Sequence, residues 1–212
     1  MATLFATLGH TPNLVLAPLR GNGTLASLHV FYGTPQEPEG KRAIAAVRGA
    51  CAGLGVNLAE HPVKNAFGYT NFLSAFSQAR ASVPRGEQVS FNASGGTRVM
   101  IMAATIFCFT RDIPLLYYDE YQTKEGTIIP LRAFRNLDRL GEMPLAILRR
   151  LQGKGPADMS TLAHDVGLSP STVTGHIQTL TEAGAVQVGR QGKRRVVTLV
   201  PDLASIELGS TS

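Results

Sequence analysis

The stretch Val89–Met100, VSFNASGGTRVM, decides the fold of the longer part of the chain. Its first three residues predict the end of a β-strand, and the small polar residues at 92–98 predict a tight turn. The next stretch, VMIMAATIFCF at 99–109, is apolar almost all round, which predicts a helix buried within a domain. A strand, a small polar turn and a buried helix in this order place the turn at the carboxyl edge of an open α/β sheet, where such sheets bind ligands.

The chemistry of this turn suits an anionic ligand. Gly95 and Gly96 let a ligand approach the backbone closely, and the first N–H groups of the following helix attract negative charge. The hydroxyls of Ser94 and Thr97 can donate to a ligand oxygen or cap the helix, and Arg98 offers a planar fork that suits phosphate. An ordinary strand-to-helix turn, in which Ser94 only caps the helix, fits the same residues. The stretch has neither the Lys of a Walker A loop nor a complete G-x-G-x-x-G fingerprint.

The surrounding sequence alternates between strand and helix patterns. Strands are expected at 2–8, 27–32, 56–63 and 114–119, a returning edge strand at 127–131, and helices at 13–19, 37–54 and 69–83. This alternation predicts an α/β fold: a Rossmann-like, doubly wound, mostly parallel sheet with helices on both faces and an antiparallel edge hairpin.

Length and composition indicate a cytoplasmic protein of two domains. The 212 residues divide into a ligand-binding domain at 1–134, a charged linker or connecting helix at 135–142 and a smaller domain at 143–212. The formal net charge of +5 is compatible with a polyanionic partner such as nucleic acid. No apolar run reaches membrane-spanning length, and Cys51 and Cys108 lie in apolar helical patterns without partners at metal-ligand spacing. We therefore expect buried free thiols, no metal and no membrane association.

The region 143–212 has the pattern of a DNA-binding module. Amphipathic helices are expected at 144–151, 159–166 and 170–183, followed by strands at 185–188 and 196–200 around the basic tip GRQGKRR. Gly167 suits the left-handed residue that ends the second helix, while Ser169 and Pro170 suit the cap and first residue of the third. The sequence LAHDVGLSPSTVTGHIQTLTEAGAV resembles the core of a winged helix–turn–helix, a likeness that extends from about Met143 to Pro201.

The third helix and the wing predict contact with double-stranded DNA. Val173, Ile177 and Leu180 share one face of the helix, and the opposite face carries no acidic residue before Glu182. Such a face can approach phosphates and base edges without repulsion, and a cationic wing can neutralise phosphate. The residues expected to contact DNA are Ser169, Ser171, Thr172, Thr174, His176, Gln178, Arg190, Lys193, Arg194 and Arg195. A winged helix used only for protein contacts is the alternative.

The region before this module resembles the CRISPR-associated Rossmann-fold (CARF) domain, and the whole chain resembles a CARF regulator with a winged helix. Two motifs carry the resemblance. TLGHTPNLV, with Thr7, Gly9, His10 and Thr11, stands at the position of the family's first ligand loop. NASGGTRVM matches the family's fourth-strand motif, in which a polar residue and small residues precede Thr-Arg at a helix start. The strand YYDE with its return hairpin also fits.

The resemblance implies a CRISPR-associated transcriptional regulator. It implies a homodimer that binds a cyclic oligoadenylate, expected to be cyclic tetra-adenylate, at the interface of two CARF domains, with no catalytic residue and no cofactor. The implied ligand residues are Thr7, Gly9, His10, Thr11, Asn92, Ser94, Gly95, Gly96, Thr97 and Arg98. Gly33 and Thr34, after the second strand, are further candidates for the pocket, although an ordinary turn explains them better.

Two other functions stay open. Some CARF domains resemble ring nucleases that cleave their bound ligand with a ribose 2′-hydroxyl, and Arg98, Ser94 and His10 suit the positioning and charge stabilisation that this reaction needs. No paired carboxylates, metal cluster or nucleophile elbow in the sequence supports another hydrolytic reaction. The third function is a Rossmann-like regulator that senses another nucleotide or a metabolite. The operator sequence, the ring size and the sign of the ligand's effect on DNA binding stay open.

Overall fold

The computed structural model describes residues 2–20, 25–119, 126–137, 139–192, 194–205 and 208. The chain divides into two compact units, Met1–Ile129 and Pro130–Ser212. This division lies a few residues before the boundary expected at 134. The physical reason is that the helix after Pro130 contributes Ala133 to the core of the second unit.

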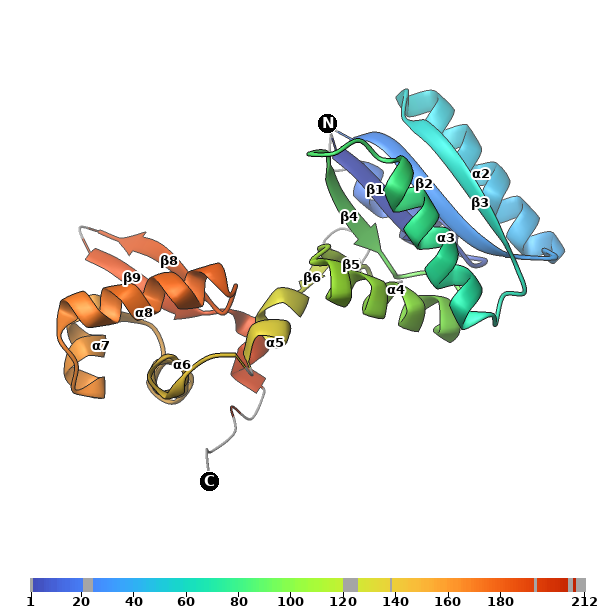
Figure 1. Ribbon diagram of the computed structural model, residues 1–212. Helices are drawn as coiled ribbons and strands as arrows, with labels where there is room; N and C mark the ends of the chain where they lie inside the picture. The colour runs from blue at the N-terminus through green and yellow to red at the C-terminus, as the bar shows by residue number, and fades with distance from the viewer. Residues whose placement is uncertain are drawn as a thin grey trace. The chain divides into compact units, whose positions relative to one another are not determined.

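The first unit is built around a six-stranded sheet with the order β3-β2-β1-β4-β5-β6 (Figure 1). Its strands are β1 (Ala2–Thr7), β2 (Leu25–Thr34), β3 (Asn57–Lys64), β4 (Gln88–Asn92), β5 (Leu115–Tyr117) and β6 (Thr127–Ile129). All neighbours run parallel except β5 and β6, which pair antiparallel, so the predicted Rossmann-like sheet with an edge hairpin is confirmed. The chain winds outward from β1 to β3 and returns on the other side of β1, which puts the topological switch point between β1 and β4.

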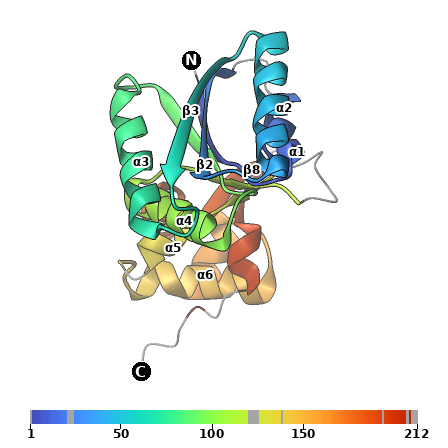
Figure 2. The same ribbon diagram turned by 90° about the vertical axis from the view of Figure 1, so that its right-hand side faces the viewer.

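Helices cover both faces of this sheet. On one side α1 (Pro12–Leu16) packs with α2 (Pro38–Leu54), and on the other α3 (Tyr69–Ser82) packs with α4 (Arg98–Arg111), as Figure 2 shows for α2 and α3. The first helix is shorter than the expected 13–19, and a 3₁₀ turn at Ala17–Arg20 continues it. Pro18 explains the change, because it has no N–H to donate to an α-helical turn and disfavours helical backbone in the residue before it.

The two faces of the sheet bury different side chains. The face covered by α1 and α2 packs aliphatic residues, among them Leu4, Leu28, Val30, Ile44 and Val47. The opposite face packs aromatic rings, of which Phe76 of α3 is the centre. Its ring centroid lies 4.8 Å from that of Phe31 and 4.9 Å from that of Phe91, both edge to face. Because both faces are covered, the central strands are buried on both sides, as in other parallel sheets.

The second unit is a winged helix–turn–helix. Its elements are α5 (Leu131–Leu137), α6 (Glu142–Lys154), β7 (Ala157–Asp158), α7 (Met159–Val166), α8 (Pro170–Glu182), β8 (Val186–Gln191), β9 (Arg194–Leu199) and a 3₁₀ turn at Pro201–Ser205. The strands form a small sheet with the order β7-β9-β8. The inward face predicted for α8 is confirmed, since Val173, Ile177 and Leu180 are buried in the core. The predicted helix ends are confirmed as well: Gly167 has φ 68°, and Ser169 Oγ accepts from Thr172 N at 3.2 Å.

Two expectations about where strands end were wrong, one for the edge strand of the first unit and one for the wing. The edge strand expected at 127–131 ends at Ile129, because Pro130 cannot continue the strand ladder. The helix α5 begins at Leu131 and runs into the segment expected to be a linker or connecting helix. In the wing, the strands extend to Gln191 and restart at Arg194 instead of leaving a seven-residue tip. Gly192, at φ 62°, suits the short turn between them, while Lys193 lies outside the described residues.

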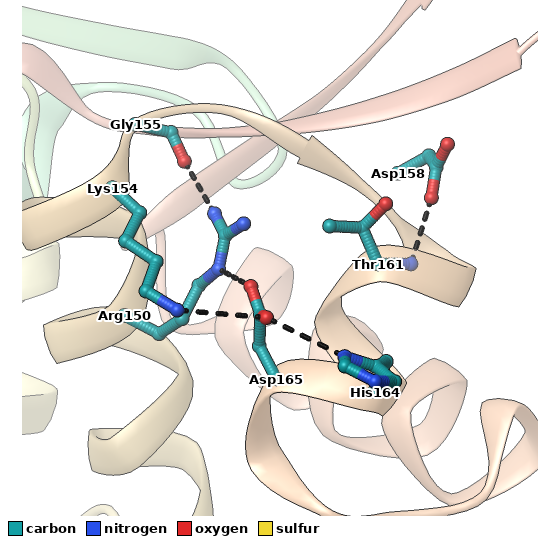
Figure 3. A network of polar contacts seen from close by, with 7 residues as sticks. All are labelled: Arg150, Lys154, Gly155, Asp158, Thr161, His164 and Asp165. Atoms are coloured by element: carbon teal, nitrogen blue, oxygen red, sulfur yellow. Dashed lines mark hydrogen bonds and ion pairs between the residues drawn. The ribbon is translucent and has the colours of Figure 1, made fainter.

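A polar network joins α6 to α7 (Figure 3). Arg150 Nε donates to Asp165 Oδ2 at 2.6 Å, and Arg150 Nη1 donates to the carbonyl oxygen of Gly155 at 2.7 Å. The side chains of Arg150 and Asp165 are only 11% and 15% exposed, so salt screens this pair less than a surface pair. The hydrogen bond from Arg150 holds the pKa of the Asp165 carboxyl below its ordinary value. The network thus fixes α7, the first helix of the helix–turn–helix.

Cys51 and Cys108 are buried free thiols, as predicted, and burial raises the pKa of both. Nowhere in the described part of the chain do three or more His, Cys, Asp or Glu side chains gather in a way that could hold a metal ion. Among the described helices, none combines the length and the apolar composition needed to cross a bilayer.

Two histidines on β2 and β3 touch the aromatic face of the sheet. His29 Nδ1 lies 3.0 Å from His61 Nε2, and the His61 ring stacks on Phe31 at a centroid distance of 4.5 Å. Burial lowers the pKa of His29, and burial together with the neighbouring His29 lowers the pKa of His61 to about 4. Both rings are therefore neutral in the folded protein near pH 7.

This pair predicts acid sensitivity of the first unit. The pKa of an unperturbed histidine is 6.5, so His61 of the unfolded chain is protonated below that pH, whereas His61 of the folded protein stays neutral down to about pH 4. The free energy of unfolding should therefore fall as the pH is lowered through this window, by at most about 1.4 kcal/mol per pH unit for one histidine. Urea unfolding at several pH values measures the slope. His61→Phe, which keeps the stacking on Phe31, should flatten it, and an unchanged slope in this variant would contradict the assignment.

Candidate functional site

One cavity lies at the carboxyl edge of the sheet in the first unit. The segments that follow β1, β2, β3 and β4 all line it, and its volume is about 560 Å³. Its lining residues are Leu8, Gly9, His10, Thr11, Leu14, Gly33, Pro35, Gln36, Glu37, Ala66, Phe67, Ser94, Gly95, Gly96, Thr97 and Met100. A cavity of this size at a topological switch point is where an open α/β sheet binds small ligands.

Glycines bring the walls of the cavity into backbone contact. A Cβ on Gly9 would lie 2.8 Å from Gly96 N, and a Cβ on Gly95 would lie 2.8 Å from the carbonyl oxygen of Thr7. On the other side, a Cβ on Gly33 would collide with Cβ of Ala66. Larger residues at these positions would push the loops apart. The sequence predicted that Gly95 and Gly96 let a ligand approach. In the structure Gly95 also lets the loop after β4 touch the loop after β1, and Gly96, at φ 96°, adopts a backbone conformation that favours glycine.

The turn after β4 is held by its own polar side chains. Thr97, not Ser94, caps α4: its Oγ1 accepts from Met100 N at 3.3 Å and donates to the carbonyl oxygen of Ala66 at 2.9 Å. Ser94 Oγ instead donates to Asn92 Oδ1 and accepts from Tyr118 N at 2.7 Å. Asn92 is 1% exposed and donates from Nδ2 to the carbonyl oxygen of Leu14 at 2.8 Å. These bonds fix the shape of the turn.

Seven of the ten predicted ligand residues line the cavity: Gly9, His10, Thr11, Ser94, Gly95, Gly96 and Thr97. The other three do not. Thr7 is fully buried, and its hydroxyl has no hydrogen-bond partner among the described residues. Asn92 is buried beneath the turn, and Arg98 is exposed on the first residue of α4, outside the lining. Of the two further candidates, Gly33 lines the cavity and Thr34 does not.

On the side of the cavity formed by the segments after β2 and β3, sequence reasoning named only Gly33 and Thr34 and missed the other residues. Gln36, Glu37, Ala66 and Phe67 line it there. The signal was available, because the carboxyl ends of parallel strands meet at one edge of a sheet, and both segments follow predicted strands. Among the described residues that line the cavity, only His10 and Glu37 can carry charge. A negative ligand group in one protomer would therefore rely on backbone N–H groups rather than on a lysine or arginine of the lining.

In the second unit, α8 exposes most of the residues predicted to contact DNA. Ser169, Ser171, Thr172, Thr174 and Gln178 are exposed, and His176 is half-buried. Several of them bond within the helix: Thr174 Oγ1 donates to the carbonyl oxygen of Pro170 at 2.8 Å, and Gln178 Nε2 donates to Glu182 Oε1 at 3.1 Å. A hydroxyl that donates to the helix keeps its lone pairs for an incoming donor.

The wing brings two arginines beside this helix. Thr174 and Gln178 of α8 line a cleft of about 470 Å³ together with Arg190 and Arg195 of the wing. Arg190 and Arg195 are cross-strand partners, and neither pairs with a carboxylate of a described residue. Like charges opposite each other destabilise a hairpin. Their presence here indicates a polyanionic partner that offsets the repulsion.

Arg194 differs from the other two arginines of the wing. Its Nη1 donates to Asp158 Oδ2 at 3.3 Å. Asp158 also caps α7, where Oδ1 accepts from Thr161 N at 2.8 Å. The hydrogen bonds from Thr161, and to a lesser extent Arg194, hold the pKa of Asp158 below its ordinary value. The charge of Arg194 is therefore partly compensated within the unit.

Comparison with known families identifies the second unit. Residues 142–187 match the family model described as winged helix-turn-helix DNA-binding. No curated protein matches the chain.

Three solved structures illustrate the similarity. Can2 from Sulfobacillus thermosulfidooxidans, in complex with cyclic tetra-adenylate, is 13% identical with a TM-score of 0.49, and the match covers 96% of this chain and 62% of that one. A type III CRISPR defence DNA nuclease activated by cyclic oligoadenylate is 13% identical with a TM-score of 0.46, and the match covers 91% of this chain and 36% of that one. A probable transcriptional regulator from Pseudomonas aeruginosa is 26% identical with a TM-score of 0.31, and the match covers 34% of this chain and 59% of that one. The chain spans less than two thirds of the length of each of these structures.

The contact between the loops after β1 and β4 predicts a stability difference between two glycine variants. Gly9→Ala places a methyl group against backbone atoms of Gly96, and such overpacking should destabilise the first unit by about 1–3 kcal/mol. Gly49→Ala is the matched control: it lies in α2 with no atom within 4 Å of its added Cβ, and it should stabilise the helix by about 0.5–1 kcal/mol. Urea unfolding compares them, and equal stabilities would show that the loops tolerate separation.

The two unpaired wing arginines predict the salt dependence of DNA binding. Removing a phosphate contact with Arg190→Ala or Arg195→Ala should weaken binding and lower the slope of log Kobs against log salt by about 0.9. Arg194→Ala should have a smaller effect, because Asp158 already compensates that charge. Fluorescence anisotropy with duplex DNA at several salt concentrations measures all three variants. A larger loss for Arg194→Ala than for the other two would contradict the assignment.

Proposed function

We propose that this protein is a CRISPR-associated transcriptional regulator of the CARF type. Its first unit binds a cyclic oligoadenylate, and its winged helix binds double-stranded DNA in the cytoplasm. The observation that carries the proposal is a switch-point cavity in a Rossmann-like sheet, on the same chain as a winged helix with a cationic wing. One unit offers a ligand site and the other a DNA contact, which is the arrangement of a ligand-controlled regulator.

The lining of the cavity supports a nucleotide-like ligand. Gly9, Gly95 and Gly96 expose backbone at one side, next to the N-terminus of α4, where the helix dipole favours phosphate. Hydroxyl and amide side chains nearby suit ribose oxygens. A ring of four nucleotides is too large for one such cavity, so two copies of the chain would share it.

The exposed side of α4 supports a homodimer. Met102 and Ile106 are 53% and 43% exposed and stand one turn apart on this helix, with Arg98 one turn before Met102. Exposed apolar side chains in a stripe suit an isologous contact, in which the same helix of a second copy covers them. Arg98 would then stand at the end of the dimer contact nearest the turn after β4. In this arrangement each copy supplies an arginine to the phosphates of the shared ring.

Ligand binding would act on DNA binding through the spacing of two winged helices. The half-sites of a dimeric helix–turn–helix lie about 34 Å apart or at a multiple of that distance, so a small rotation of the two copies changes affinity. Thermodynamic linkage then requires DNA to change ligand affinity by the same factor.

The proposal is tested by DNA titration with and without ligand. Labelled DNA from the region upstream of the protein's own coding sequence is titrated with full-length protein in the presence and absence of cyclic tetra-adenylate. The DNA affinity should change by about 5- to 150-fold, the usual range for coupled sites. An unchanged affinity would remove the regulatory part of the proposal. Chromatography of the same samples for linear products separates a regulator from a ring nuclease.

Variants of the two units should separate the two activities. Arg98→Ala should abolish the thermal stabilisation by cyclic tetra-adenylate and leave salt-dependent DNA binding intact. Replacing Lys193, Arg194 and Arg195 by alanine should do the reverse. Arg42→Ala removes an exposed arginine of α2 that pairs with Glu39 outside the cavity, so it should leave both activities unchanged. Loss of both activities in Arg98→Ala would indicate a folding defect instead.

A further inference from the structure

The two sides of the cavity differ in chemistry. The loops after β1 and β4 contribute three glycines, hydroxyls and the N-terminus of α4, all of which suit phosphate and ribose. The segments after β2 and β3 contribute Gln36, Glu37 and Phe67, of which Glu37 carries a negative charge. A carboxylate repels phosphate but accepts hydrogen bonds from amino groups. A ligand with separate anionic and amino-bearing ends therefore has one favoured orientation.

Phe67 is unusual for an aromatic residue on this unit, because 72% of it is exposed. The short loop that carries it is nevertheless well held. Phe67 N donates to Asn65 Oδ1 at 3.0 Å, Asn65 N donates to the carbonyl oxygen of Thr34 at 3.1 Å, and Thr97 Oγ1 donates to that of Ala66 at 2.9 Å. An exposed ring on a loop bonded to two other cavity loops is placed before any ligand arrives, so binding costs little ordering of this loop.

We infer that Phe67, Glu37 and Gln36 form a nucleobase subsite that selects adenine. The face of Phe67 stacks on the base, and the Glu37 carboxylate accepts a hydrogen bond from the exocyclic amino group at C6. Gln36 lines the same side, and its Nε2 donates to the carbonyl oxygen of Gly33, which ties the side chain to the end of β2 beside Glu37. The inference rests on the proposed function and deepens it, because it assigns the base to one side of the cavity and the phosphates to the other.

This subsite explains how a glycine-lined phosphate site would discriminate among cyclic oligonucleotides. Backbone N–H groups read phosphate equally well for every base. Guanine and hypoxanthine carry an oxygen at C6 in place of the amino group and a proton on N1. The oxygen repels a carboxylate placed opposite C6, and a hydrogen bond from N1–H to Glu37 requires the base to shift along its edge. Glu37 is exposed in the unbound protein, so the discrimination depends on the base covering this carboxylate when it stacks on Phe67.

The stacking part is tested with Phe67 variants of the full-length protein and cyclic tetra-adenylate as the probe. Phe67→Ala should weaken binding at least about fivefold, as expected for the loss of one base–aromatic stack, and Phe67→Tyr should bind like the wild type. Leu54→Ala is the matched control: it is 56% exposed at the other end of α2, about 26 Å along the helix from Glu37. Equal affinity of Phe67→Ala and wild type would overturn the stacking role.

The selectivity part is tested by comparing cyclic tetra-adenylate with cyclic tetra-inosinate, which has an oxygen in place of the amino group at C6 and a proton on N1. The wild type should prefer the adenylate ring. Glu37→Gln, whose amide can donate to an oxygen or accept from an amino group, should bring the two affinities close together. A preference unchanged by Glu37→Gln would overturn the role of Glu37.

Failure of the proposed function is distinguishable from failure of this inference. If the wild type binds no cyclic oligoadenylate, the proposed function is wrong, and the base subsite is tested with AMP against ribose 5-phosphate, which lacks only the base. A preference for AMP that disappears in Phe67→Ala supports the subsite. Equal binding of the two by the wild type overturns it. Unchanged DNA binding and thermal unfolding in each variant show that the fold is intact.

Discussion

Backbone contact between neighbouring loops is the constraint on which the cavity depends. Gly9 meets Gly96 across the switch point, and Gly33 meets Ala66 on the other side of β1. Each contact leaves no space for a side chain, so the four loops enclose a cavity of about 560 Å³ instead of spreading apart. The parallel order of the strands brings the loops to one edge, and the glycines decide how closely they approach. The Thr97 cap then ties one loop pair to the other through the carbonyl oxygen of Ala66.

The charges of the two units point to different kinds of recognition. In the first unit the cavity has few charges, and its polar groups are mostly backbone and hydroxyl, which suits a ligand read by shape and hydrogen bonds. In the second unit Arg190 and Arg195 oppose each other on one hairpin, which favours the diffuse negative charge of a DNA backbone. Arg194 shows that not every cation of the wing is equally available, because Asp158 both caps α7 and pairs with it.

The sequence predicted the elements better than it predicted the roles of individual side chains. The strand and helix alternation, the edge hairpin and the Ser169 cap followed from local patterns, and local patterns largely set such elements. The role of Ser94 could not be predicted, because its hydrogen-bond partner Tyr118 is distant in sequence and meets it only in the folded sheet. The exposure of Phe67 was missed for a related reason: apolar residues are normally assigned to a core, and the backbone bonds that hold this ring at the surface are not visible in composition. The start of α5 at Leu131 was not predicted, because the apolar run before and after Pro130 fits an edge strand equally well.

The hydrogen bond from Tyr118 N to Ser94 Oγ gives the cavity a mechanical connection to the edge of the sheet. Ser94 is a wall of the cavity, and Tyr118 directly follows β5, whose antiparallel partner β6 ends at Ile129, the last residue of the unit. A bound molecule that accepts from this hydroxyl replaces Asn92 Oδ1, and one that donates to it shares the oxygen with the main-chain N–H of Tyr118. Either change alters the hydrogen bonding around the residue that follows β5, at the edge of the sheet next to the end of the first unit.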